Sequence, residues 1–196
     1  MLTIEGLRVQ NVTLDLEIRP GEIVCLAGPS GSGKSLLLRA VADLIPHQGR
    51  VLLNGEDCAG MPAHIWRRRV SLLPAESRWW ADLVGEHFPQ PVPEEMAALG
   101  FGPEVMQWQV SRCSTGERQR LAILRLLAQS PLALLLDEPT ASLDHESIGR
   151  VEEMIDRYRR RHRAPVLWVS HDPDQMRRVA DRRLEINGGR VEEVRR

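Results

Sequence analysis

The chain has 196 residues, a formal net charge of −1, and 42% hydrophobic and 27% charged residues. That length allows one domain with a sizeable core, and the composition is typical of a globular protein rather than a disordered one. The small net charge excludes a protein that is drawn to nucleic acid or to anionic lipid by its overall field.

The first half of the chain predicts strands, a helix and a hairpin. Apolar residues alternate over 14–18, which indicates a half-buried strand, and run continuously over 23–27, which indicates a buried one. A glycine-rich loop follows, and residues 36–45 have the pattern of a helix. The pair Asn54-Gly55 then predicts a hairpin turn.

The second half predicts two more buried strands with a helix between them. ALLLDEPT at 133–140 contains a buried strand that ends in acids, and APVLWVSHD at 164–172 contains another. Residues 147–162 place their apolar side chains on one helical face. A closing hairpin is expected around Asn187-Gly188. Buried strands that alternate with helices imply an α/β fold whose mostly parallel sheet is covered on both faces.

The segment 77–112 differs from the rest of the chain. It is rich in proline, tryptophan and glutamate, and it lacks the pattern of a buried strand. We interpret it as a small, mainly helical insertion.

The sequence also restricts the cellular setting. Cys25, Cys58 and Cys113 are far apart and form no C-x-x-C pair, so neither a disulfide framework nor a zinc site is indicated. A reducing cytoplasm is the simplest compartment for them. The N-terminus lacks a signal pattern, and the longest apolar runs are too short to cross a bilayer. We therefore expect any role at a membrane to need a partner.

The stretch GPSGSGKS matches the phosphate-loop pattern G-x-x-x-x-G-K-[ST]. It follows a predicted strand and opens a predicted helix, which is the context that this motif requires. Glycines let backbone N–H groups point at phosphate oxygens, the helix N-terminus adds its positive end, and the serine hydroxyl is placed to ligate Mg²⁺. The predicted phosphate-binding residues are Gly28, Pro29, Ser30, Gly31, Ser32, Gly33, Lys34 and Ser35.

Lys34 is the only lysine among the 26 basic residues of the chain. A lysine is a compact point charge on a thin stem and can lie in such a loop to reach the β- and γ-phosphates. The wider planar fork of arginine would require the loop to open. We therefore interpret Lys34 as the phosphate-binding cation.

Two acids end the predicted strand at 133–137. Ligands bind at the carboxyl ends of strands in a doubly wound sheet, so Asp137 is placed to hold Mg²⁺, directly or through water. Glu138 is placed to orient or deprotonate an attacking water. The alternative is that these acids only cap the next helix.

The segment CSTGERQR at 113–120 precedes a predicted helix, and with the other motifs it resembles the ATP-binding cassette (ABC) ATPases. That family carries LSGGQ or LSGGE followed by RQR. The order of phosphate loop, Q-loop, signature, acidic strand, D-loop and switch histidine is also kept along the whole chain. The resemblance implies a P-loop NTPase core with a mostly parallel sheet, an N-terminal antiparallel β subdomain and a short helical insertion. We expect one domain over 1–196, with the helical subdomain at about 77–129.

The family resemblance also assigns roles to residues outside the phosphate loop. Two cassettes dimerise head to tail, so that the signature of one faces the phosphate loop of the other across two ATP molecules. Ser114 and Gly116 then contact nucleotide, Asp144 in ASLD is the D-loop acid, and His171 is the switch histidine that contacts the γ-phosphate. Taken alone, His171 is better explained as a structural histidine at a strand end; within the ordered set of motifs the switch role is favoured.

Two departures from the family pattern concern the nucleotide. The Q-loop glutamine is replaced by Ala75, and either the neighbouring Glu76 substitutes for it or the contact is lost. Residues 1–27 contain no aromatic that could stack on adenine, so Arg8 or Val9 is expected to cover the base instead. Thr115 replaces the first glycine of the signature and leaves Gly116 intact.

Aromatic and basic clusters have two interpretations each. Trp79 and Trp80 follow the Q-loop and either anchor a membrane permease in the adjacent groove or fill the core of the insertion. The arginine runs at 67–69 and 157–163 are interpreted as solvated faces, so no nucleic-acid partner is expected.

The expected function is the ATP-binding and ATP-hydrolysing subunit of an ABC transporter. It would act with ATP and Mg²⁺ as a dimer, on a separate permease, at the cytoplasmic face of a bacterial membrane. LLPAES, the paired tryptophans and VLWVSHD loosely resemble the ATP subunits of bacterial metal (iron) exporters. Two alternatives are a soluble ABC ATPase that acts on DNA or ribosomes, and a degenerate cassette that binds ATP as a regulatory switch with little turnover.

Overall fold

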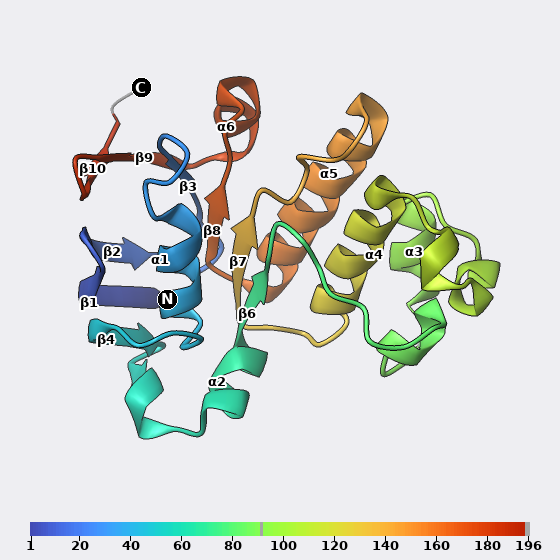
Figure 1. Cartoon of the computed structure of the whole chain (residues 1–196), viewed down its shortest axis with the longest axis horizontal. Coiled ribbons are helices and arrows are strands. Elements are labelled where there is room, and N and C mark those ends of the chain that lie inside the picture. The colour runs from blue at the N-terminus through green and yellow to red at the C-terminus, as the bar shows by residue number, and fades with distance from the viewer. Residues whose placement is uncertain (91, 195–196) are drawn as a thin grey trace.

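A computed structural model of the chain describes residues 1–90 and 92–194. Within these residues ten strands form one mixed sheet, in the order β5-β4-β1-β2-β10-β9-β3-β8-β7-β6 (Figure 1). The strands are β1 Leu2–Val9, β2 Val12–Ile18, β3 Ile23–Ala27, β4 Gln48–Leu53, β5 Glu56–Asp57, β6 Val70–Leu73, β7 Ala133–Asp137, β8 Val166–Val169, β9 Arg182–Asn187 and β10 Arg190–Glu193.

Along the chain, most of the helices lie in the segments that connect the parallel strands. The α-helices are α1 Lys34–Val41, α2 Ala63–Arg69, α3 Pro93–Ala98, α4 Thr115–Leu127, α5 His145–His162 and α6 Pro173–Val179. Four short 3₁₀ helices are η1 Cys58–Gly60, η2 Val84–His87, η3 Pro103–Gln107 and η4 Val110–Arg112. Among the described residues, none of the helices is both long and apolar enough to cross a membrane.

The sheet has an antiparallel end and a parallel end. β1 pairs antiparallel with β2 and β4, and the β9–β10 hairpin joins this end to β3. β3, β8, β7 and β6 then run parallel to one another. Because parallel strands all end at one edge, the segments that follow β3, β7 and β8 meet there. The predicted α/β fold with an N-terminal antiparallel part is confirmed.

The parallel strands β3, β7 and β8 are buried on both faces, as their continuous apolar sequences predict. Leu135 and Val169 point into a core shared with α1 and the antiparallel strands. Their neighbours Leu134 and Trp168 point into a second core, shared with α4 and α5. The sheet therefore separates two apolar cores and is held rigidly between them.

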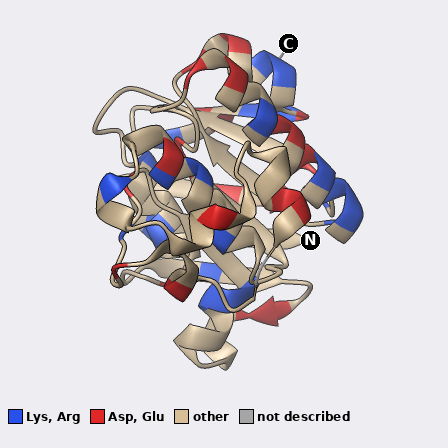
Figure 2. Cartoon of the chain, turned by 90° about the vertical axis from the view of Figure 1, so that its right-hand side faces the viewer, with Lys and Arg blue, Asp and Glu red and all other residues tan. Residues whose placement is uncertain are grey.

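The short helices η2, α3, η3 and η4 gather with α4 at one side of the sheet (Figure 1). An isolated antiparallel bridge joins Leu83 to Gln109 and ties the two ends of this region together. Acidic and basic segments are interspersed on the face that this side presents (Figure 2), so neither sign of charge dominates it.

Some predicted boundaries shift. The strand at 23–27 and the Asn54-Gly55 turn lie where they were predicted, and both turn residues have positive φ. The last hairpin turns at Gly188-Gly189 rather than Asn187-Gly188, because Asn187 pairs with Arg190. The helix predicted over 36–45 begins earlier and ends at Val41, because Asp43 adopts a left-handed conformation at φ 53°.

Candidate active site

Residues 28–33 connect the end of β3 to the first turn of α1. Gly31 and Gly33 have φ of 77° and 99°, a region that side-chain-bearing residues seldom adopt. No acidic residue lies in the first turn of α1 and no side chain caps it. The N–H groups at this helix end are therefore directed to the loop, which makes an anion site.

The phosphate loop is packed too tightly for larger residues. A Cβ on Gly33 would lie 2.8 Å from Val12 Cγ2, and one on Gly28 would lie 3.2 Å from Ile186 Cβ. The loop is thus held between the β1–β2 turn and the last hairpin. Ser32 Oγ is buried and has no hydrogen-bond partner among the described residues, so it is a donor still available to a ligand.

Lys34 is 6% exposed and turns back into the loop. Its Nζ donates to Gly28 O at 2.8 Å and to Pro29 O at 2.9 Å. Burial lowers the pKa of this ammonium group, and the nearby Glu138 and Asp137 act in the opposite direction. An ammonium group has three donors, so one remains to meet a phosphate oxygen.

Asp137 and Glu138 lie at the carboxyl end of β7, where Asp137 is buried. Glu138 has φ 48°, an unusual value for a residue with a side chain, and its N–H donates to Val169 O on β8. Its Oε1 lies 2.7 Å from Nε2 of His171, two residues beyond β8. The sheet therefore brings the predicted acids, the predicted switch histidine and Lys34 to one edge.

The signature residues form a separate cluster on α4. Ser114 caps this helix by accepting from the N–H of Glu117, whose carboxylate accepts from the N–H of Ser114 at 2.7 Å. This capping box lowers the pKa of Glu117, chiefly through the Ser114 N–H. A Cβ on Gly116 would lie 3.2 Å from Ser142 O, so the signature packs on the D-loop of its own chain.

Asp144 caps α5 by accepting from the N–H and the hydroxyl of Ser147, both at 2.9 Å. These bonds lower the pKa of its carboxyl. Within the described residues, no hydrogen bond or ion pair joins the signature at 113–117 to the phosphate loop at 28–35. The signature cluster and the phosphate loop are therefore two separate clusters in the described part of the chain.

The substituted positions are accessible. Ala75 and Glu76 are both exposed, directly beyond β6. Of the two residues expected to cover the base, Val9 is buried in the first core, whereas Arg8 is exposed. This leaves Arg8 as the side chain of that pair that can reach a ligand.

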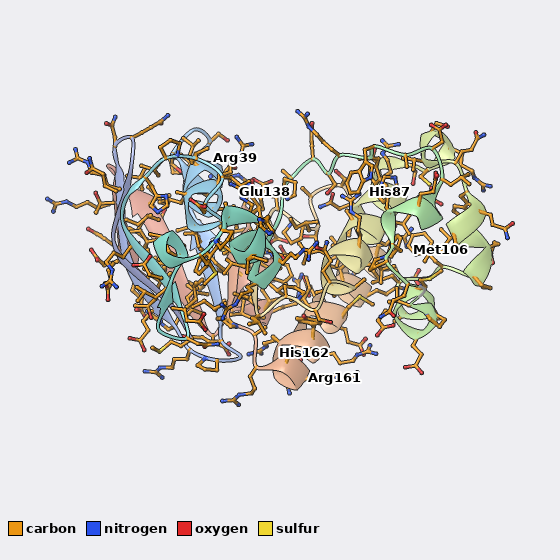
Figure 3. All side chains as sticks on the ribbon, turned by 90° about the horizontal axis from the view of Figure 1, so that it is seen from below. Arg39, His87, Met106, Glu138, Arg161 and His162 are labelled. Atoms are coloured by element: carbon orange, nitrogen blue, oxygen red, sulfur yellow. The ribbon has the colours of Figure 1, made fainter. Side chains whose placement is uncertain are left out.

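The two tryptophans, Trp79 and Trp80, differ in their exposure to solvent. Trp79 packs against the second core, with the Arg125 guanidinium 4.4 Å from its ring centre. Trp80 is 73% exposed and lines a groove of about 280 Å³ between β6 and α4. Two arginines, Arg67 and Arg125, also line this groove, and none of its described lining residues is acidic. Figure 3 shows that His87, which contacts both indole rings, lies in the helical region away from Glu138.

The charge of the arginine runs is neutralised in part. Arg157, Arg159 and Arg160 each pair with an acid of the same helix, α5. Arg69 pairs with Glu56, and Arg67 donates to Asp43 O. Both runs thus lie on largely exposed faces, as the sequence predicts, and nearby acids pair with some of their arginines.

Sequence reasoning missed two residues that shape the site. Val12 occupies the space that a Cβ on Gly33 would need. Gln119 is buried and donates to Pro139 O, which directly follows Glu138. The signal for Gln119 was its place within Arg118-Gln119-Arg120, but a polar residue on a helix gives no sequence sign of its burial.

Comparison with solved structures identifies the class of fold. The chain matches the structure described as "Dimeric structure of a post-hydrolysis state of the ATP-binding cassette MJ0796 bound to ADP and Pi" with a TM-score of 0.83, at 19% identity, with 100% of both chains covered. At that identity the likeness shows the fold, which is that of an ATP-binding cassette.

Sequence comparison identifies the family. The family model described as "ABC transporter" matches residues 11–141. "Probable iron export ATP-binding protein FetA" of Escherichia coli (strain K12) is 35% identical, with 93% of this chain and 87% of FetA covered. "Fe(3+) ions import ATP-binding protein FbpC" of Streptomyces coelicolor is 36% identical, with 97% and 60% covered. The chain belongs to the ABC transporter family, as an ATP-binding subunit with ATPase activity.

Proposed function

We propose that two copies of this chain close head to tail on ATP and that the closed dimer drives a separate membrane permease. The separation of two clusters within one chain supports this proposal. Lys34, Glu138 and His171 gather at one sheet edge, while the signature cluster with Ser114 and Gly116 meets no phosphate-binding residue within the described part of its own chain. A second copy, turned head to tail, supplies the missing half to each site.

The chemistry of hydrolysis follows from the edge residues. Phosphate-loop N–H groups and Lys34 bind the β- and γ-phosphates, and Glu138 accepts a proton from the attacking water. The water oxygen bonds to the γ-phosphorus as the bond to the bridging oxygen breaks, which releases ADP and phosphate. His171, 2.7 Å from Glu138, holds that carboxylate in place. Ser114 and Gly116 of the other copy donate to the γ-phosphate, and Asp144 orders the D-loop at the interface.

Ser35 and Asp137 would hold Mg²⁺. The buried Asp137 carboxylate and a serine hydroxyl at the helix N-terminus are both oxygen ligands, which this hard cation prefers, and nucleotide phosphates complete its coordination. The ion supplies charge stabilisation to the leaving phosphates. No protein cage is needed, because Mg²⁺ is usually bound through few carboxylates and substrate oxygens.

The permease docks in the groove between β6 and α4, at the cytoplasmic face of the membrane. Trp80 is an exposed aromatic of the kind that anchors interfaces, and the residues described along the groove include two arginines and no acid. The partner segment is therefore apolar and carries a carboxylate. Relatives are named for iron export, iron import and sulfonate import, so the sequence similarity reflects the shared ATPase and does not identify the transported substrate.

The test is a Glu138→Gln variant. Loss of the general base should lower phosphate release by about a hundredfold or more while ATP still binds, so an ATP-bound dimer accumulates. Size-exclusion chromatography with light scattering measures that dimer. Glu153→Gln, on the ion-paired outer face of α5, is the matched control and should behave as wild type. A Glu138→Gln chain that stays monomeric at every MgATP concentration would contradict the dimer.

A further inference from the structure

A buried glutamine connects the two strand ends that carry Glu138 and His171. Gln175, on α6, is 2% exposed. Its Oε1 accepts from Ser170 Oγ at 2.9 Å, and its Nε2 lies 2.8 Å from Thr140 Oγ1 and 2.9 Å from Glu152 Oε1. Three elements therefore meet at one amide: the segment after β7, the end of β8, and α5.

The chemistry of the neighbours fixes the orientation of this amide. Glu152 is ion-paired with Arg178 and, as a carboxylate, can only accept a hydrogen bond. Nε2 of Gln175 must therefore face Glu152, which leaves Oε1 facing the hydroxyl of Ser170. A group that donates on one side and accepts on the other is required here. An apolar residue would leave buried groups unpaired, and a carboxylate would face a second carboxylate.

The residues that Gln175 joins are next to the proposed catalytic pair. Thr140 is two residues after Glu138, and Ser170 immediately precedes His171. The backbone of Glu138 is in the left-handed region, a conformation that persists only when its surroundings hold it. Gln119, on α4, donates to Pro139 O in the same segment. The segment after Glu138 is thus held from both α4 and α6.

We propose that Gln175 is a positioning residue for hydrolysis, which fixes the distance and orientation between Glu138 and His171 by joining Thr140 to Ser170. In this proposal it acts through Glu138 and His171 and not on the nucleotide itself. The proposal rests on the roles assigned to Glu138 and His171 above. It predicts a defect in turnover without a defect in ATP binding, because the phosphate loop lies on a different pair of elements, β3 and α1.

Four variants test this inference by steady-state phosphate release over a range of ATP concentrations. Gln175→Leu removes the polar contacts, and Gln175→Glu places a second carboxylate against that of Glu152. Both should lower kcat about tenfold or more with KM unchanged, since small displacements of reacting groups carry penalties of that order. Glu152→Gln keeps an acceptor oxygen and should change little. The double variant Gln175→Glu/Glu152→Gln restores a donor–acceptor pair and should recover most of kcat.

A control separates positioning from stability. Tyr158→Phe removes a part-buried hydrogen bond from α5 to Pro131 O, before the start of β7, far from this edge. It should lower the melting temperature and leave kcat unchanged. If Gln175→Leu and Gln175→Glu turn over at the wild-type rate, or if the double variant shows no recovery over Gln175→Glu, the inference is overturned. Glu138→Gln distinguishes the failures: if it still hydrolyses ATP, the proposed catalytic roles themselves are wrong.

Discussion

The residues of the phosphate loop and those of the aromatic cluster that follows the Q-loop are subject to different physical constraints. The cluster consists of Trp79, Trp80, His87 and Arg125. In the loop, backbone conformation and steric room together require glycine. Gly33 has φ 99°, and Val12 occupies the space that a Cβ would need. In the cluster, adaptable side chains pack around one another, with His87 edge-on to both indoles and Arg125 over them. Trp79 Nε1 and His87 Nδ1 are buried there without a described hydrogen-bond partner.

At the end of the molecule that binds nucleotide, the available space restricts which residues can be present. At the end proposed to meet a permease, the binding partner restricts them instead. An arginine-rich chain keeps its one lysine at the first end and places an exposed tryptophan at the second. Substitutions at the two ends should therefore separate nucleotide binding from coupling.

The largest effect is expected from Lys34→Ala. Loss of a buried cation that meets two phosphates should weaken ATP binding by about a hundredfold or more, roughly 2.7 kcal/mol. Isothermal titration calorimetry measures the affinity. Lys34→Arg keeps the charge and should fail as well, because its fork does not fit the loop. Arg39→Ala, an exposed cation on the same helix, is the control; unchanged affinity in Lys34→Ala would refute the phosphate-loop assignment.

A second substitution tests whether space alone requires glycine in the loop. Gly33→Ala should weaken ATP binding by about 1–3 kcal/mol, from the positive φ and from the clash with Val12. Adding Val12→Ala removes the clash but not the backbone strain, so affinity should recover in part. Full recovery would show that φ is unimportant, and no recovery would show that Val12 does not limit the loop.

At the other end, Trp80→Ala should weaken permease binding by about 2 kcal/mol, the scale of an interface hot spot, with ATP affinity unchanged. Co-purification of the two chains from detergent-solubilised membranes measures it. Trp79→Ala is the contrasting variant, because Trp79 packs against the second core and its loss should lower the melting temperature instead. Equal permease binding by wild type and Trp80→Ala would remove the groove from the interface.

The smallest effect concerns the missing Q-loop glutamine. If the contact is lost, Ala75→Gln should raise kcat by about a few-fold, because it restores a group that positions water. If Glu76 already substitutes, Ala75→Gln should add nothing and Glu76→Gln should lower kcat. Phosphate release by both variants decides between these interpretations, and a rate unchanged in both would mean that this loop does not limit turnover.

Sequence alone predicted the features that depend on local backbone chemistry. The phosphate loop, the buried strand at 23–27 and the turn at Asn54-Gly55 are specified by residues adjacent in the chain. The early end of α1 was missed because Asp43, rather than a glycine, takes the left-handed position. No local sequence pattern indicates that Asp43 adopts this conformation, because packing overrides the helix propensity of residues at a helix end.

Features that depend on contacts between distant residues were not predictable. Gln175 lies on a helix with polar neighbours, and only the fold brings Thr140 and Ser170 to it. Similarly, one of two adjacent tryptophans is covered and the other is exposed, although their sequence context is nearly the same. Burial of a side chain is a property of the assembled core and not of the pattern along the chain.

The single lysine has a practical consequence for chemical labelling. No other side chain in the sequence carries a primary amine, so an amine-selective acylating reagent can modify only Lys34 once the α-amino group has been blocked. Burial lowers the pKa of Lys34 and so increases its neutral, nucleophilic fraction. Bound nucleotide would shield Nζ from the reagent. The intact mass of the protein after a brief pulse would then report, chain by chain, the fraction of occupied sites.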